Sequence, residues 1–367
     1  MSNSLRRLAT FLALVLLAAL LLLPSGCGNG GSGKGRTGED EKTPEQPAEG
    51  YLFCFWNVEN LFDDKLDGYK HQPDKRYDEE FAEKEGLLDE KLGKLSKVLL
   101  SMNSGKGPDI LALAEVENEN AADLLRQRLN KDLGDKAEPY RNLLFKENKS
   151  GRNIATAILT RLPVRANRTR KLDGHRRILE GHIEVNDHPL VIIASHWTSR
   201  VSDDEKEGSG RAKYADLIYG RFKAMFMANP DIDLLICGDF NDTPEDRSVI
   251  EHLHATGKRS EVTRDTHEPH LFNLSAGHDR EKFGTHLFKR KWFIFDQIIV
   301  SPGLLDDKGW TVLPDTLKTV RHISMQNQFG GPWSFDRNFQ NRPIKDGGQR
   351  GVADHFPVTV RLRVQGR

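Results

Sequence analysis

The feature of this sequence that most constrains its fold is a repeated pairing of a short apolar segment with a polar residue at its C-terminal end. In the clearest case, residues 233–242 (DLLICGDFND), a buried strand is predicted to lead into Asp239, Asn241 and Asp242. Gly238 permits a tight turn there. Because carboxylate and amide oxygens suit hard cations such as Mg²⁺, Mn²⁺ or Ca²⁺, this strand end is a candidate metal or phosphate site.

Further apolar segments carry polar groups: three end in them, one has an acid within the apolar run, and one has an Asp-His pair just before the last predicted strand. They are FCFWNVEN (53–60), DILALAE (109–115), LVIIASH (190–196), FIFD (293–296) and ADHFPV (353–358). Any one of the six, including the segment around Asp239, could be an ordinary solvated turn. Six in one chain indicate strands that converge on a shared polar site, because ligands often bind where strands end.

Regular spacing of apolar residues predicts the other elements. Repeats of three and four residues predict amphipathic helices over 79–102, 121–129 and 211–228. Shorter apolar stretches predict strands near 140–145, 153–160, 178–185 and 189–195. Two sheets packed face to face, with helices outside, fit this order of elements.

These segments together resemble the endonuclease/exonuclease/phosphatase superfamily. The matching pieces are WNVEN (56–60), ALAEVEN (112–118), NIATAILT (153–160), ASHWTSR (194–200), GDFND (238–242), FDQIIVS (295–301) and GVADHFPV (351–358). The resemblance extends over residues 51–363. It implies an α/β fold, a four-layer sandwich of two packed mixed β-sheets flanked by helices, and phosphoester hydrolysis that depends on a divalent metal.

The resemblance also implies which residues hold the metal. Asn57 and Glu115 match the positions of metal ligands, and Asp354 matches a position near the metal. The expected cofactor is Mg²⁺, with Mn²⁺ or Ca²⁺ as alternatives.

Five further residues match catalytic positions. Asp239 and Asn241 match the pair that orients the attacking water and contacts phosphate. His355 matches the catalytic histidine, and Asp296 the acid that binds it. His196 matches a position that contacts phosphate in the transition state. Either His355 or Asp239 could take the proton of the water.

Three other residues are weaker candidates for substrate binding, namely Asn153, Arg200 and Arg211. In addition, residues 304–351 mix aromatic with basic side chains, as do proteins that grip a nucleic-acid strand. The alternative is a loop that packs on itself at the edge of the sandwich. Within residues 284–292 the sequence Gly-Thr-His carries His286 where related sequences often have Tyr.

The start of the chain predicts export and anchoring. Arg6 and Arg7 precede an apolar run over residues 8–23, which has the length of a signal segment. The following residues resemble a bacterial lipobox ending at Cys27, with Pro24 as a departure from the usual pattern. We expect a lipoprotein signal peptide over 1–27; an uncleaved anchor and an ordinary secretory peptide are the alternatives.

Residues 28–50 are rich in Gly, Ser, Pro and charge, which predicts a flexible tether. The catalytic domain is expected over 51–367 as one unit, because the candidate residues are spread along all of it. The protein is expected to be a monomer in the cell envelope, membrane-anchored through Cys27 and facing outside the cytoplasm; secretion is the alternative.

The substrate is the open question. Lys and Arg together number 54, as do Asp and Glu, so no broad electrostatic attraction to nucleic acid is indicated. The sequence favours a nuclease that hydrolyses phosphodiester bonds of nucleic acid. A phosphatase or lipid phosphodiesterase acting on a headgroup or inositol phosphate is the alternative, and a non-catalytic surface lipoprotein is a minor one.

Overall fold

The computed structural model describes residues 49–148, 151–173, 176–200, 209–338, 342–345 and 347–366. All of them belong to one compact unit, Thr43–Arg367. The expected signal peptide, Cys27 and nearly all of the expected tether lie outside the described residues. None of the helices in the described part of the chain has both the length and the hydrophobicity needed to cross a membrane.

One sheet contains six strands in the order β14-β15-β1-β2-β4-β3. Their bounds are β1 (Tyr51–Leu61), β2 (Ile110–Val116), β3 (Asn142–Phe145), β4 (Ala155–Thr160), β14 (Trp310–Thr319) and β15 (Val358–Val364). β1 runs parallel to β2 and antiparallel to β15, so the sheet is mixed.

The second sheet contains seven strands in the order β5-β6-β7-β8-β13-β10-β9. Their bounds are β5 (Arg170–Lys171), β6 (Arg177–Val185), β7 (His188–His196), β8 (Leu234–Asp239), β9 (Ala255–Thr256), β10 (Leu271–Asn273) and β13 (Asp296–Val300). β7 and β8 are parallel, whereas β13 is antiparallel to β8. A separate hairpin joins β11 (His286–Phe288) to β12 (Lys291–Phe293).

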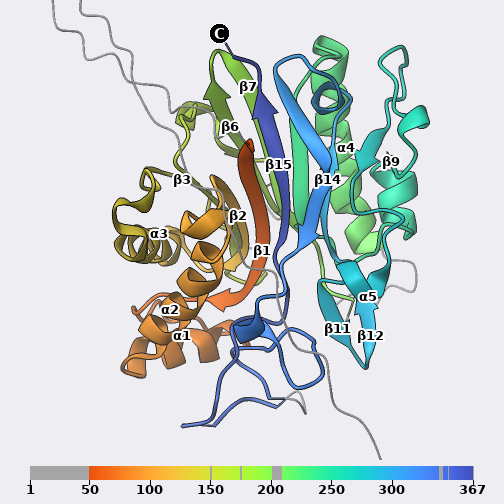
Figure 1. The fold of residues 1–367 in the computed structure, drawn as a ribbon. Helices are drawn as coiled ribbons and strands as arrows, with labels where there is room; N and C mark the ends of the chain where they lie inside the picture. The colour runs from red at the N-terminus through yellow and green to blue at the C-terminus, as the bar shows by residue number, and fades with distance from the viewer. Residues whose placement is uncertain are drawn as a thin grey trace, which may run out of the picture. The chain divides into compact units, whose positions relative to one another are not determined.

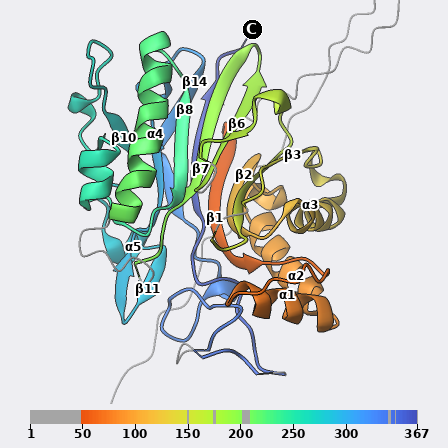
Figure 2. The same ribbon diagram turned by 180° about the vertical axis from the view of Figure 1, so that it is seen from behind.

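Helices cover the outer faces of the two sheets (Figures 1 and 2). They are α1 (Asp74–Glu83), α2 (Leu87–Leu100) and α3 (Glu119–Leu133) beside the first sheet, α4 (Ser209–Ala228) beside the second, and the short α5 (Arg280–Phe283) near the hairpin. Short helical turns lie at Asn103–Gly105, Gly134–Lys136, Ala166–Arg168, Ser248–His252, Arg259–Glu261, Gly303–Leu305 and Ile323–Met325.

The alternation of side chains along the strands builds three apolar cores. In β1, Phe53 and Phe55 lie in the core between the two sheets, whereas Cys54 and Trp56 lie in the core beneath the helices of the first sheet. A third core joins the second sheet to α4, with Ile193 and Phe222 among its members. This alternation follows from the two-residue period of a strand. The predicted four-layer α/β sandwich is confirmed.

Two local predictions differ from the structure. The helix expected over 79–102 is divided into α1 and α2, because Gly86 adopts a left-handed conformation (φ 77°) that interrupts the helical backbone. Part of the 304–351 segment, for which a loop packed on itself is one of the two interpretations, forms β14 at the edge of the first sheet. Its Pro314 is tolerated because the pairing with β15 is irregular between Leu313 and Lys318.

Candidate active site

Three strands of the second sheet place three of the candidate residues side by side. The register of β7 with β8 pairs His196 with Asp239. The register of β13 with β8 pairs Asp296 with the same Asp239. Asp239 therefore lies at the centre of the row, and all three side chains are buried.

The first sheet supplies Asn57 from β1 and Glu115 from β2. The Asn57 amide nitrogen lies 3.0 Å from Asp239 Oδ2 and 3.4 Å from Glu115 Oε1. The side chain of Asn57 thus bridges two carboxylates that belong to different sheets. The polar ends of the two sheets meet at one point, as the repeated strand ends in the sequence predict.

The backbone around these carboxylates is strained. Glu115 and Asn241 have positive φ angles, 62° and 51°, which non-glycine residues adopt infrequently. Each strained turn directs a main-chain N–H onto a carboxylate: Asn60 N lies 3.0 Å from Glu115 Oε2, and Asn241 N lies 3.0 Å from Asp239 Oδ1. Such conformations concentrate at functional sites, where the surrounding structure holds them in place.

His355 and Asp296 form a buried pair. His355 Nδ1 lies 2.7 Å from Asp296 Oδ2, and the other ring nitrogen lies 3.6 Å from Asp239 Oδ2. Burial alone would lower the pKa of His355, but the charges of Asp296 and Asp239 raise it well above its ordinary value. The imidazole is therefore cationic at neutral pH, with Asp296 fixing its orientation.

Two acids of the site, Asp239 and Asp354, have shifted pKa values. Burial raises the pKa of Asp239 to about 6 and that of Asp354 to about 6, although the charge of His355 opposes both shifts. Both carboxyl groups are therefore ionised above pH 6.

The main-chain oxygen of His355 accepts a hydrogen bond of 2.9 Å from the Trp56 indole, which ties this loop to β1.

His196 faces the same carboxylates from the opposite side. Its Nε2 lies 3.7 Å from Glu115 Oε1 and 3.8 Å from Asp239 Oδ2. Burial lowers the pKa of His196 well below its ordinary value, and the charges of Arg177 and Arg152 add to this effect. His196 is therefore neutral, and its Nδ1 has no hydrogen-bond partner among the described residues.

The weaker candidates lie around this centre with partners of their own. Asn153 donates from its main-chain nitrogen to an oxygen of Asp74 at 2.6 Å. Arg200 contacts Asp242 Oδ1 at 2.9 Å, and Arg211 contacts Asp242 Oδ2 at 2.8 Å. The two arginines converge on one acid next to Asn241, and their role in binding substrate stays a prediction.

Sequence reasoning did not identify two buried charged residues that shape the site. Glu59, considered there only as part of the strand-end motif, accepts hydrogen bonds from Ser334 Oγ and from the main-chain nitrogen of Phe335. Lys91 of α2 is fully buried and donates to the main-chain oxygen of Val352. Both partners lie far away in the sequence, so no local pattern could have indicated them.

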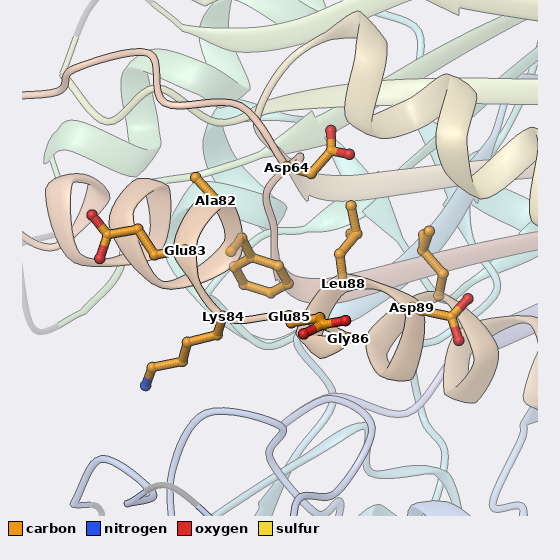
Figure 3. Close-up of a pocket in the computed structure, with 10 residues that line it drawn as sticks. Asp64, Ala82, Glu83, Lys84, Glu85, Gly86, Leu88 and Asp89 are labelled. Atoms are coloured by element: carbon orange, nitrogen blue, oxygen red, sulfur yellow. The ribbon is translucent and has the colours of Figure 1, made fainter.

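Two pockets lie in the helical half of the molecule. One, of about 410 Å³, lies between α1 and α2 around Phe81, Leu88 and Leu92 (Figure 3). None of the candidate site residues lines it. The other, of about 570 Å³, has Asn153, Lys65 and further polar side chains in its lining together with five acids, namely Asp63, Asp67, Glu117, Glu119 and Glu147.

The residues at the strand ends fit a hard divalent cation. Glu115 and Asp239 bring two carboxylates together, and Asn57, whose amide nitrogen donates to both of them here, would present its amide oxygen to a cation after rotation of the side chain. Such oxygen donors are the ligands that Mg²⁺ prefers. Asp239, Asp296 and His355 also have ligand atoms within 4.8 Å of one another. Because Asp296 is engaged with His355 Nδ1, the carboxylate of Asp239 is the member of that group best placed to take a cation.

The sequence profile described as "Endonuclease/Exonuclease/phosphatase family" matches residues 52–364. The chain belongs to this family. It is therefore a metal-dependent phosphoester hydrolase, as the strand-end motifs predict. No curated protein matches the chain in sequence.

Several solved structures share the fold of this chain at low sequence identity. An endonuclease/exonuclease/phosphatase family protein from Bacteroides thetaiotaomicron is 14% identical, with a TM-score of 0.50 over 85% of this chain and 97% of that one. Beta toxin from Staphylococcus aureus with bound magnesium ions is 13% identical, with a TM-score of 0.50 over 85% and 99%. SmcL is 14% identical, with a TM-score of 0.51 over 86% and 99%. These likenesses establish the fold alone.

Proposed function

We propose that this family member is a Mg²⁺-dependent phosphodiesterase that hydrolyses nucleic acid. The observation that carries the proposal is the convergence of Asn57, Glu115 and Asp239 beside the His355–Asp296 pair. A phosphodiester needs an anionic group to activate water and positive groups to stabilise charge on its oxygens. Both kinds of group occur within this cluster.

The protonation states suggest a division of roles. Asp239, ionised above pH 6, takes the proton of the attacking water, with Asn241 beside it to hold that water. Cationic His355 and neutral His196 donate hydrogen bonds to the phosphate oxygens. Asn57 and Glu115 would hold the cation, which when bound would supply positive charge to the phosphate oxygens.

A basic and aromatic surface beside the site favours nucleic acid as the substrate. The turn of the β11–β12 hairpin exposes Phe288, Lys289 and Arg290 (Figure 1). The Arg290 guanidinium lies 6.0 Å from the ring of Phe329, which is 60% exposed. Cations that contact backbone phosphates, next to rings on which bases stack, are the means by which proteins bind single strands. β11 begins at His286, whose ring contacts His355, so this surface adjoins the site.

A second candidate substrate, a phosphoester with a cationic headgroup, is favoured by the acidic pocket. Five acids and Asn153 are among the residues that line that pocket. Glu117 is 4% exposed, and its Oε1 accepts no hydrogen bond from the described residues. Burial raises the pKa of Glu117 to about 8, although the hydrogen bond from the main-chain nitrogen of Asp63 to its Oε2 opposes this shift. A bound ammonium group would stabilise the ionised form of this carboxyl group.

A substrate panel separates these candidates. Single-stranded DNA, RNA, a choline phospholipid and inositol phosphates are each incubated with Mg²⁺ and with chelator, and product release is measured. Cleavage of the polynucleotides, with a rate that falls in the Lys289→Ala/Arg290→Ala variant, is expected. The variant Glu117→Gln is the corresponding test of the second candidate, because it removes a carboxylate from the pocket that would bind the headgroup. Cleavage of the lipid alone, sensitive to Glu117→Gln, would replace the first candidate with the second.

We also propose that the enzyme works outside the cytoplasm, anchored through lipid on Cys27. The support comes from the sequence: Arg6 and Arg7, the apolar run and the lipobox-like Cys27 precede a polar tether. A tether of this composition would let the catalytic domain reach substrates away from the membrane surface.

A further inference from the structure

His286 lies at the site, but it has no role in the hydrolysis described above. It begins β11, and its ring lies 4.5 Å from that of His355 and 5.8 Å from that of Phe295. It is only partly buried, so one edge of the imidazole is accessible. In its neutral form the imidazole of His286 carries one nitrogen lone pair.

The hydrogen bond of His286 fixes which nitrogen carries this lone pair. Its Nδ1 lies 2.9 Å from the main-chain oxygen of Asp354. A carbonyl oxygen accepts only, so Nδ1 holds the proton and Nε2 holds the lone pair. His355 is anchored in the same way, with Nδ1 at 2.7 Å from Asp296 Oδ2. A ring fixed through Nδ1 by an oxygen acceptor is the usual arrangement of a histidine that binds a metal.

Three ligand groups meet at this place. Ligand atoms of His286, Asp354 and His355 all lie within 4.8 Å of one another. Zinc–ligand distances of about 2.0–2.1 Å in a tetrahedral site place ligand atoms about 3.3 Å apart. Binding of Zn²⁺ therefore requires these atoms to move closer together, by up to about 1.5 Å (4.8 Å less 3.3 Å).

The chemistry of this set differs from that of the Asn57 and Glu115 set. Two imidazoles and one carboxylate suit Zn²⁺ and other borderline-soft ions, whereas amide and carboxylate oxygens suit Mg²⁺. The carboxylates of Asp296 and Asp239 lie beside His355, so they would offset the positive charge of a metal ion bound there. Asp354, which the sequence also predicts near the Mg²⁺, would be shared between the two sets, so they select different ions at overlapping places.

We propose that His286, Asp354 and His355 form a binding site for Zn²⁺ or a similar transition-metal ion, and that occupation of this site inhibits hydrolysis. Inhibition follows because the metal displaces the proton of cationic His355 to solvent and takes its Nε2, the nitrogen that faces Asp239 and the substrate. The inhibitory role rests on the proposed function, whereas the binding of the metal does not.

Binding of Zn²⁺ to the metal-free protein is measured by competition with a chromophoric chelator, in millimolar Mg²⁺ and without substrate. The wild type is expected to bind one Zn²⁺, and His286→Phe to bind it at least about tenfold more weakly, since even the loss of an outer partner of a ligand costs about 10–100-fold. The control is His278→Phe, at a partly buried histidine that stacks on Phe283 at 4.0 Å. Equal affinities of the wild type and His286→Phe would overturn the site.

A second variant and a second readout guard against misfolding. His286→Tyr carries the residue that related sequences often have, and thermal unfolding confirms that each variant is folded. Mg²⁺-supported hydrolysis of bis-p-nitrophenyl phosphate is then titrated with Zn²⁺. Inhibition of the wild type at about tenfold lower Zn²⁺ than either His286 variant is expected. Activation by Zn²⁺, or equal inhibition of all variants, would overturn the inhibitory role. Because the first experiment uses no substrate, its outcome is independent of whether nucleic acid is cleaved.

Discussion

The ammonium group of Lys91 donates a hydrogen bond of 2.7 Å to the main-chain oxygen of Val352, across 261 residues of sequence. Lys91 lies in α2 and is fully buried, and Val352 precedes Asp354 by two residues. The ammonium also lies 4.6 Å from the ring of Phe335. The helical layer of the first sheet therefore holds the loop that carries Asp354 and His355.

Lys91→Met is expected to loosen that loop. The change keeps most of the side-chain volume but leaves the Val352 oxygen buried without a donor, which lowers the free energy of unfolding by about 1–3 kcal/mol. Denaturant unfolding measures this loss, and kcat should fall with it. The control is Lys94→Met: Lys94 donates to Arg350 O at 2.6 Å, but its side chain is 30% exposed, so water can replace it. Equal losses in the two variants would contradict a special role for Lys91.

The parts of this site that the sequence could predict are local. Asn57, Glu115, His196 and Asp239 each come directly after an apolar run within its strand, so a short window contains both the run and its functional residue. The period of two along a strand then fixes the layers, because it assigns alternate residues to two different cores.

The parts that it could not predict depend on distant partners. The Lys91 position reads as the polar side of an amphipathic helix, and only the folded chain brings Val352 to it. Glu117 reads as a surface acid beside the predicted ligand Glu115, yet its main-chain neighbours bury it. His286 is visible in the sequence as an unusual residue, but its distance to His355 comes from the pairing of β11 with β12 and the packing of that hairpin.

His355 and Asp296 are expected to act as one unit. His355→Ala removes a charged donor from the site and should lower kcat by about 10²–10⁴-fold. Asp296→Asn should also lower kcat, because the imidazole loses its anionic partner. The double variant should lose little more than the worse single variant. His254→Ala, at a ring that stacks on Tyr219, is the control. Losses that multiply would show that Asp296 does not serve His355.

Activity is expected to disappear in excess chelator and to return with Mg²⁺ or Mn²⁺. Glu115→Gln keeps the shape of the side chain but removes the charge of one ligand. The cation concentration for half-maximal activity should therefore rise by roughly tenfold or more. The matched control is Glu119→Gln, which removes the same charge at an exposed position four residues later. Full activity of the wild type in chelator would refute the assignment of Glu115.

Glu180 in β6 should make stability depend on pH below about 4.5. Its carboxylate is fully buried and contacts Arg221 at 2.6 and 2.8 Å. Burial alone would raise the pKa of Glu180, but the hydrogen bonds from Arg221 and His182 lower it to about 2. The unfolded chain therefore binds a proton at higher pH than the folded one. This stabilisation is complete above pH 4.5 and is lost as pH falls toward 2.

Glu180→Gln is therefore expected to lower the free energy of unfolding at pH 7 by about 3 kcal/mol, since it leaves Arg221 without its buried partner. The difference between variant and wild type should shrink as the pH is lowered to 2, as measured by urea unfolding at each pH. The control is Glu184→Gln in the same strand, whose partner Arg165 is 49% exposed; it should cost about 0–1 kcal/mol. A difference that stays constant with pH would show that the charge of Glu180 is not the cause.

Cys27→Ser tests the proposed anchor. If Cys27 carries lipid, the variant should appear in the soluble extracytoplasmic fraction or remain as a longer precursor, since the serine hydroxyl does not replace the thiol in lipid attachment. Two or more acyl chains on one residue are needed for stable anchoring, so loss of the attachment residue should release the protein fully rather than in part. Fractionation, precursor length and incorporation of labelled palmitate measure these outcomes, with Ser32→Ala in the expected tether as control. Unchanged membrane association together with unchanged processing in Cys27→Ser would favour an uncleaved anchor over residues 8–23.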